Sequence, residues 1–195
     1  MILRSLLIAG LAGAACQAHA QVQTNLPDSS VKIRDIRSVF QQIEKDSGLN
    51  KVTLNQEEFL GDEAPDNGGS LRGYFRGDTL CKASTWIGLS YAVIQEHFYY
   101  SNGQLIFVFE TEDDFAQKAG GLDPSKLVRS FEARYYFEKD NVLRVLTKGK
   151  RKMDADDPHH YLELYHNAHY YAGLLVKKHR IQKPVSPATV PARTT

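Results

Sequence analysis

The chain has few of the residues that build disulfide frameworks: two of its 195 residues are cysteine, Cys16 and Cys81. Charge of one sign is not in excess either. The formal net charge is +1, so composition gives no reason to expect a nucleic acid or an acidic membrane surface as partner. A phosphate-binding glycine loop, a Gly-x-Ser-x-Gly elbow, a His-Glu-x-x-His zinc signature and a Cys-x-x-Cys pair are all missing. These absences argue against the enzyme classes that such motifs define.

Long apolar runs are also missing, apart from one near the start. Within Met1–Ala20 a basic residue, Arg4, precedes an apolar run, and the segment ends on the small-residue pattern Ala-x-Ala. This arrangement predicts a secretory signal peptide, and its apolar run is too short to span a bilayer. Cleavage after Ala20 would export the protein to the periplasm or the cell exterior and leave no transmembrane segment.

The two cysteines keep further alternatives open. Cys16 follows Gly-Ala-Ala, and bacterial lipoproteins are cleaved just before a cysteine that follows small residues, so a lipid anchor at Cys16 is the second possibility. If cleavage falls at Ala20, Cys81 is the remaining cysteine and no intramolecular disulfide can form. Cys81 is then either a small buried side chain on the same strand face as Ala83, or one half of an intermolecular disulfide.

An Asn-Gly turn gives the clearest structural signal. Asn102-Gly103 stands between two aromatic and β-branched runs in the stretch FYYSNGQLIFVF. Both residues accept the positive φ angles of a two-residue type I′ turn, so the stretch predicts a β-hairpin. Aromatics, a polar turn and a leucine recur in Tyr74–Leu80 and in Tyr135–Leu143. Three hairpins predict an antiparallel meander of about six strands.

Weaker signals fill the gaps between the hairpins. We expect two strands that meet near Gly88, and a short candidate strand at Lys51–Asn55 before the polar connector 62–69. A short helix around Asp113–Lys118 is expected within the insertion that precedes the last hairpin.

An amphipathic helix is predicted on each side of the hairpins. In the first, Ser30 is the expected cap and apolar residues recur at helical spacing until Gly48. In the second, Asp157 caps, Pro158 takes the first helical position, and an apolar stripe follows from Tyr161 to Val176. Both stripes need a partner surface, so the sequence predicts an α+β fold with an N-terminal and a C-terminal helix packed on the sheet.

The predicted organisation is a single domain. Residues 1–20 form the signal peptide, 21–29 a flexible segment, and 30–180 the α+β domain. Residues 181–195 contain three prolines among Ser, Thr and Ala and are expected to be a disordered tail.

The hairpin element also carries a resemblance. FYYSNGQL, echoed by GYFRGDTL and RYYFEKDNVL, resembles the Tyr-Tyr-x-Asn-Gly-x-Leu unit of exported β-repeat proteins such as the MORN-type variant repeats. It is also similar to a group of small uncharacterised secreted β-hairpin proteins of the Bacteroidetes. The resemblance implies export and an antiparallel sheet. It carries over no catalytic residue.

Tyrosines before each turn are the first candidate site. Successive side chains of a strand point to opposite faces, so one ring of each aromatic pair should point outward. Tyr74, Tyr99 and Tyr135 would then line up across the strands. They are either a stacking ladder or a platform for a glycan or a partner protein.

The histidine-rich second helix is the other candidate. Glu163 and His166 have Glu-x-x-His spacing, with His169 one turn further, and such neighbours on a helix can share a metal ion. At helical spacing His159, Glu163, His166 and Tyr170 lie opposite the apolar stripe, so they are expected to face solvent.

The sequence therefore predicts an exported, non-enzymatic protein without a cofactor, which binds a protein or glycan through an aromatic sheet face. One alternative is a metal-dependent enzyme that uses Glu163, His166 and His169. Another is an envelope structural protein tethered through Cys16.

Overall fold

The computed structural model describes residues 29–63, 65–152 and 157–182. Within these residues seven strands form one antiparallel sheet in chain order, so the predicted α+β meander is confirmed, with seven strands instead of six. The predicted signal peptide with Cys16 and most of the predicted tail lie outside the described residues. The strands are β1 (Asn50–Asn55), β2 (Gly69–Arg76), β3 (Thr79–Gly88), β4 (Ala92–Ser101), β5 (Gln104–Lys118), β6 (Gly121–Glu138) and β7 (Asn141–Gly149).

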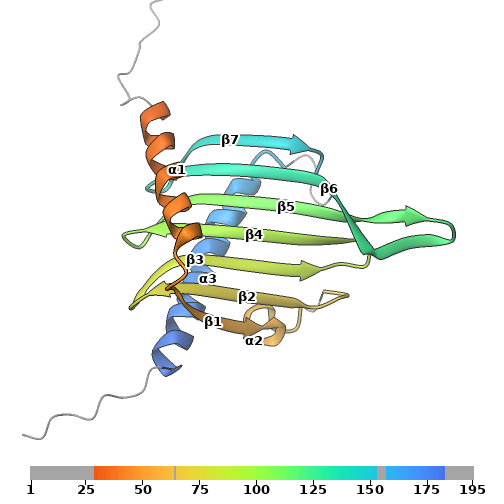
Figure 1. Ribbon diagram of the computed structural model, residues 1–195, viewed down its shortest axis with the longest axis horizontal. Helices are drawn as coiled ribbons and strands as arrows, with labels where there is room; N and C mark the ends of the chain where they lie inside the picture. The colour runs from red at the N-terminus through yellow and green to blue at the C-terminus, as the bar shows by residue number, and fades with distance from the viewer. Residues whose placement is uncertain (1–28, 64, 153–156, 183–195) are drawn as a thin grey trace, which may run out of the picture.

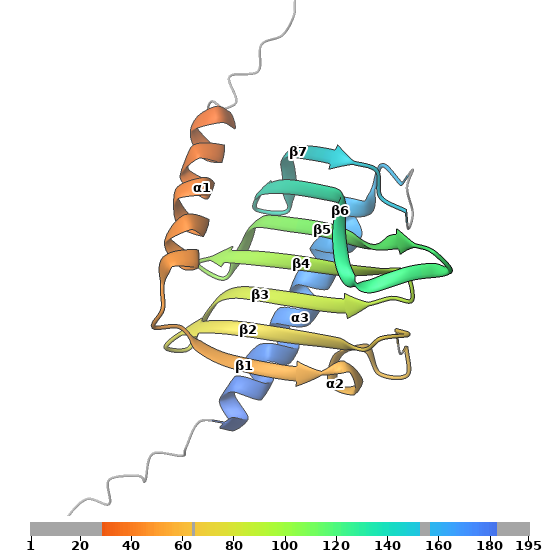
Figure 2. The ribbon, with the colours of Figure 1, turned by 45° about the vertical axis from the view of Figure 1, so that its right-hand side comes forward.

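Helices cover both faces of this sheet. α1 (Ser29–Lys45) lies on one face, and α3 (His160–Gln182) crosses the other obliquely, as the two views in Figure 1 and Figure 2 show. The sequence did not predict the short α2 (Gln56–Leu60), which follows β1. Asn55 and Glu58 form a capping box at its start.

The three predicted turns are present. Asn102 and Gly103 have φ angles of 51° and 77°, as a type I′ turn requires. The other two hairpins turn at Gly77, with φ 59°, and at Lys139, with φ 54°.

A β-bulge follows each turn. Cys81 in β3, Ile106 in β5 and Leu143 in β7 have no partner in the register of the preceding strand. A bulge interrupts the alternation of side chains, because two residues then oppose one. Cys81 therefore packs on the α1 face while Ala83 packs on the α3 face. The prediction that these two residues share a face is wrong, whereas Cys81 is buried as expected.

Each helix has its own apolar core with the sheet. On the α1 side, Phe40 stacks on Phe107 at 4.9 Å between ring centroids. On the α3 side, the Tyr100 hydroxyl donates a hydrogen bond to the carbonyl of Ala168 at 2.7 Å. The core under α1 contains Ile33, Ile36, Ile43, Cys81, Tyr99, Phe107 and Tyr136. The larger core under α3 includes Leu71, Phe75, Phe98, Val108, Ala133, Leu164, Tyr171 and Leu175.

Some predicted boundaries are wrong. Asp113–Lys118 is the end of β5, not a helix, because this segment pairs with β6 and Asp113 binds Arg129 there. α3 begins at His160, two residues after Pro158, and the Asp157 carboxylate accepts a hydrogen bond from the His159 backbone in the turn before it. α3 also runs to Gln182, two residues into the predicted tail.

Gly149, at the end of β7, leads to a first stability prediction. Its φ is 81°, and a Cβ there would lie 1.9 Å from the Ser130 carbonyl oxygen, so Gly149→Ala must push β6 and β7 apart. Gly103 has a φ of 77° with nothing within 4 Å, which makes Gly103→Ala the matched control. We expect Gly103→Ala to cost about 1–2 kcal/mol from the left-handed backbone alone, and Gly149→Ala clearly more. Urea unfolding, followed by fluorescence of the single tryptophan, Trp86, measures the difference. Equal costs would contradict the steric argument.

Candidate functional site

Two glutamates are buried on the α3 face of the sheet. Glu96 in β4 is 6% exposed, and Glu110 in β5 is 2% exposed. They are direct cross-strand partners, so their side chains are neighbours. A buried carboxylate is costly unless it is paired and hydrogen-bonded, so the surroundings of each glutamate decide its state.

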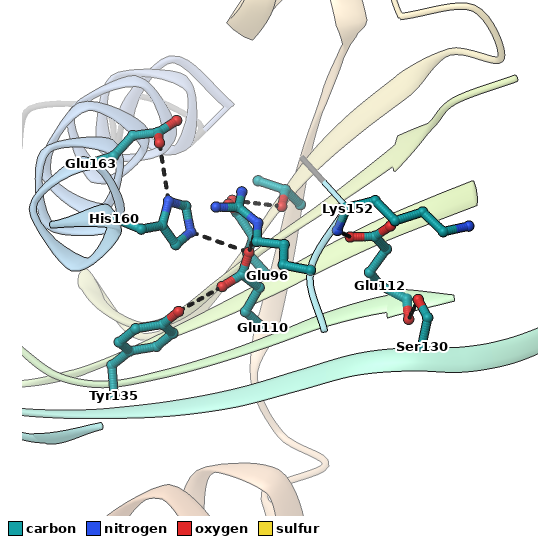
Figure 3. A network of polar contacts seen from close by, with 10 residues as sticks. Glu96, Glu110, Glu112, Ser130, Tyr135, Lys152, His160 and Glu163 are labelled. Atoms are coloured by element: carbon teal, nitrogen blue, oxygen red, sulfur yellow. Dashed lines mark hydrogen bonds and ion pairs between the residues drawn. The ribbon is translucent and has the colours of Figure 1, made fainter. Parts of the chain in front are cut away.

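Glu110 is held by three side chains from distant parts of the chain, as Figure 3 shows for Tyr135 and His160. The Tyr135 hydroxyl donates to Glu110 Oε2 at 2.9 Å. His160 Nε2 and Arg151 Nε each lie 3.2 Å from Oε1. The other ring nitrogen of His160 lies 3.1 Å from Glu163 Oε2. Both carboxylate oxygens of Glu110 are therefore occupied by protein groups.

These contacts move the pKa values of Glu110 and His160 apart. Burial by itself would raise the pKa of Glu110, but the hydrogen bond and charge of His160, the charge of Arg151 and the Tyr135 hydroxyl outweigh it and lower that pKa. Burial would lower the pKa of His160, but its bond to Glu110 and the charge of Glu110 raise it. The two groups form a buried ion pair at the start of α3.

Glu96 is in the opposite situation. Burial and the negative charge of Glu110 raise its pKa to about 7, although a hydrogen bond from the Thr85 hydroxyl at 3.0 Å favours the ionised form. Glu96 therefore changes its charge near neutral pH, beside a neighbour that stays ionised.

A cavity of about 500 Å³ opens next to Glu96, between α2, the sheet and α3. Half of the residues that line it are apolar, and they come from α2, β3, the loop after β3, β4 and α3. Its polar lining comes from Glu63, Glu96, Arg151, Glu163, Asn167 and Tyr170, and its apolar lining from Phe59, Leu60, Ile87, Leu89, Ile94 and Tyr171.

Arg151 belongs to this cavity and to a second one. The second has a volume of about 330 Å³ and also contains His160, Tyr135 and Lys150. The Arg151 side chain is 11% exposed, and its Nη1 is buried without a hydrogen-bond partner in the described part of the chain. Buried polar groups are nearly always hydrogen-bonded, so a buried guanidinium N–H without a partner requires an explanation.

The three predicted tyrosines do not form one exposed row. Tyr74 and Tyr99 lie on the α1 face, where the Lys82 ammonium is 5.3 Å from each ring centroid. Tyr135 lies on the α3 face and binds Glu110, and Tyr99 and Tyr135 are 4% and 5% exposed. The structural counterpart of Tyr99 in the last hairpin is Tyr136, one residue further, whose ring is 5.0 Å from that of Phe107. Tyr99, Phe107 and Tyr136 therefore form a ladder of rings, which packs against α1.

The residues of α3 that were considered as metal ligands face solvent, as expected from the helical spacing. His159, Glu163, His166 and Tyr170 are all exposed. The ring of His169 contacts the ring of Tyr165 at 4.5 Å. No group of three His, Cys, Asp or Glu side chains in residues 29–63, 65–152 and 157–182 is arranged to hold a metal ion. Glu163, His166 and His169 are therefore not brought together as ligands.

Sequence reasoning missed Glu96, Glu110, Arg151 and His160. The strands carried a signal for the glutamates: Glu96 alternates with the inward-facing Ile94 and Phe98 of β4, a position that normally holds an apolar residue. Nothing local predicted the contact of His160 with Glu110, because the two residues are 50 positions apart.

An exposed aromatic side chain that was not predicted is Trp86. It is 38% exposed, in a hollow of about 370 Å³ on the α1 face with Arg72, Gln95 and His97.

Comparison of the chain with protein-family models, with curated proteins and with solved structures gave no significant match. In the part of the chain that the structure describes, no helix is long and apolar enough to cross a bilayer.

Proposed function

We propose that this is an exported binding protein that takes a small organic ligand into the cavity beside Glu96. The proposal rests on two groups that line one cavity. Glu96, a buried carboxyl with a pKa of about 7, and the largely buried guanidinium of Arg151 line the same cavity, and half of the residues that line it are apolar. Ligand sites combine an apolar lining with a few well-placed polar groups, and groups with shifted pKa values gather at such sites.

Export is part of this proposal and is supported by the leader pattern of residues 1–20. The sequence of the mature N-terminus tests it. A start at Gln21 agrees with a soluble exported protein, a lipid-modified Cys16 agrees with the tethered alternative, and an intact Met1 contradicts both.

Acid–base catalysis is a second candidate, favoured by the Glu96–Glu110 pair. Two adjacent carboxyl groups with pKa values pushed in opposite directions are typical of enzymes that use one as acid and one as base. Glu110, however, has both oxygens engaged by Tyr135, His160 and Arg151. Only Glu96 of the pair lines the cavity, so binding is the function that the geometry favours.

Blocking the cavity from α3 tests the proposal. Asn167 lines the cavity, and the adjacent His166 is exposed and does not, so Asn167→Trp and His166→Trp are matched variants of one helix. We expect at least one class in a panel of cationic, neutral and anionic organic molecules to raise the melting temperature of the wild type. A ligand at about 100 times its Kd stabilises by about 2.7 kcal/mol, or roughly 5–10 °C for a domain of this size.

The same compounds should stabilise His166→Trp equally and Asn167→Trp much less. If every class leaves the wild type unchanged, or stabilises both variants to the same extent, the proposed site is wrong.

A further inference from the structure

The apolar lining indicates what kind of molecule the cavity beside Glu96 accepts. Phe59 is 2% exposed, and Ile94, next to Glu96 on the same face of β4, is 7% exposed. With Ile87 they offer a hydrophobic wall from three elements of the fold. Burying apolar surface against such a wall is favourable, at roughly 25 cal/mol per Å². The ligand therefore has an apolar body.

The charges around the cavity indicate the polar end of that molecule. Arg151 and His160 already have a charged partner in Glu110, and Glu163 is bonded to His160. Glu96 accepts its hydrogen bond from the neutral hydroxyl of Thr85, and it faces the negative charge of Glu110 across the strands. When Glu96 is ionised, it is thus a buried carboxylate of the lining without a cation partner in the described part of the chain, whereas Glu63, which also has none there, is exposed.

We infer that the cavity binds an organic amine, with its ammonium group at the Glu96 carboxylate and its apolar body against Phe59, Ile87 and Ile94. The inference rests on the proposed function, because it identifies the ligand of the same site. An ammonium group supplies the missing positive charge, and its three N–H donors match the carboxylate oxygens. A carboxylate ligand would instead add negative charge beside Glu96, Glu110 and Glu163.

Binding of an amine is coupled to the proton on Glu96. Several charged or polar groups face Glu96: Thr85 on β3, Glu110 on β5, His160 and Glu163 on α3, Arg151 after β7 and Glu63 after α2. Burial, and then the charges of Glu110 and Glu163, raise its pKa, and the Thr85 hydroxyl and His160 oppose that rise. Below neutral pH the carboxyl is protonated and must release its proton before it pairs with an ammonium. Amine affinity should therefore increase from pH 5.5 to pH 8, by about 10-fold or more.

Titration calorimetry with three probes of equal chain length tests the inference. We expect hexylamine to bind the wild type with a Kd below about 1 mM at pH 8, and 1-hexanol and hexanoate to bind at least about 10-fold more weakly. At pH 6, the heat of hexylamine binding should depend on the ionisation enthalpy of the buffer, as release of a proton requires. Glu96→Gln should weaken hexylamine at least about 10-fold and abolish the buffer dependence. Glu57→Gln, an exposed change on α2 outside the cavity, should do neither.

The results of these titrations distinguish a wrong amine assignment from a wrong proposal that the cavity is a ligand site. If hexanol or hexanoate binds as tightly as hexylamine and Asn167→Trp removes that binding, the amine assignment is wrong while the cavity remains a ligand site. If hexylamine does not bind, or binds Glu96→Gln and wild type alike, the amine assignment is also wrong, and the melting experiment with the full panel decides the proposed function by itself. Both Gln variants must keep a cooperative unfolding transition for the comparison.

Discussion

Replacing Glu96 with glutamine is expected to stabilise the folded protein at pH 8 and to change its stability little at pH 4.5. Burial and the charge of Glu110 raise the pKa of Glu96 to about 7, against 4.5 for an unperturbed glutamate. The folded state therefore holds the proton more tightly than the unfolded state, and stability falls as pH rises from 4.5 to 7. Above pH 7 ionised Glu96 lowers the free energy of unfolding by the full amount, about 3 kcal/mol at 1.36 kcal/mol per pKa unit. Glutamine does not ionise and escapes this cost.

Urea unfolding of wild type and Glu96→Gln at pH 4.5, 6 and 8 measures the effect. Glu110 and His160 titrate in both proteins, so the difference between the two free energies of unfolding reports mainly on Glu96. A difference that is constant across these pH values would mean that Glu96 has an ordinary pKa. A gain in stability with a loss of amine binding would follow the general trade-off between stability and function.

Replacing Glu110 with glutamine is expected to have the opposite sign and to destabilise the folded protein strongly. The variant leaves His160 and Arg151 buried without their shared counter-charge. Removal of one partner from a buried ion pair typically costs about 3–5 kcal/mol. The pKa of His160 is raised above its ordinary value of 6.5, so at pH 6 His160 is charged in the native protein and its contribution to this cost is present.

Glu163→Gln is the matched control, because Glu163 binds the other nitrogen of the same imidazole from a side chain that is 59% exposed. An exposed pair of this kind contributes less than about 1 kcal/mol. Circular dichroism during urea unfolding of both variants at pH 6 makes the comparison. Similar costs for the two substitutions would show that the ion pair under α3 does not hold the fold together. The His160 contribution should also disappear as pH rises through its raised pKa, so the cost of Glu110→Gln should shrink at pH 9.

Of the tyrosines predicted to line up as a binding platform, Tyr74 and Tyr99 lie on the α1 face and Tyr135 on the α3 face, and Tyr99 and Tyr135 are buried. The polar groups that converge on the cavity beside Glu96 lie on the α3 face of the sheet. The histidine-rich helix does take part in the site, but through His160, which lies one turn before Glu163 and faces the sheet.

Part of the fold was determined by sequence alone, because its causes act within a few residues. The Asn102-Gly103 turn is set by which residues tolerate positive φ, and the buried stripe of α3 by helical periodicity. These local rules predicted the antiparallel hairpins, the two long helices and the outward direction of His166. They failed for Asp113–Lys118, where pairing with β6 overrides the local preference.

Only the tertiary structure decided the site. A single-residue bulge after each turn reverses the face of the residues that follow it, so the faces of Cys81 and Ala83 could not be assigned from simple alternation. The state of Glu96 and Glu110 depends on how much water each loses and on charges brought from 50 residues away, such as His160. Desolvation and long-range Coulomb interactions have no signature in a short window of sequence. Local sequence therefore determined where the turns fall, whereas tertiary packing determined which carboxyl keeps its proton.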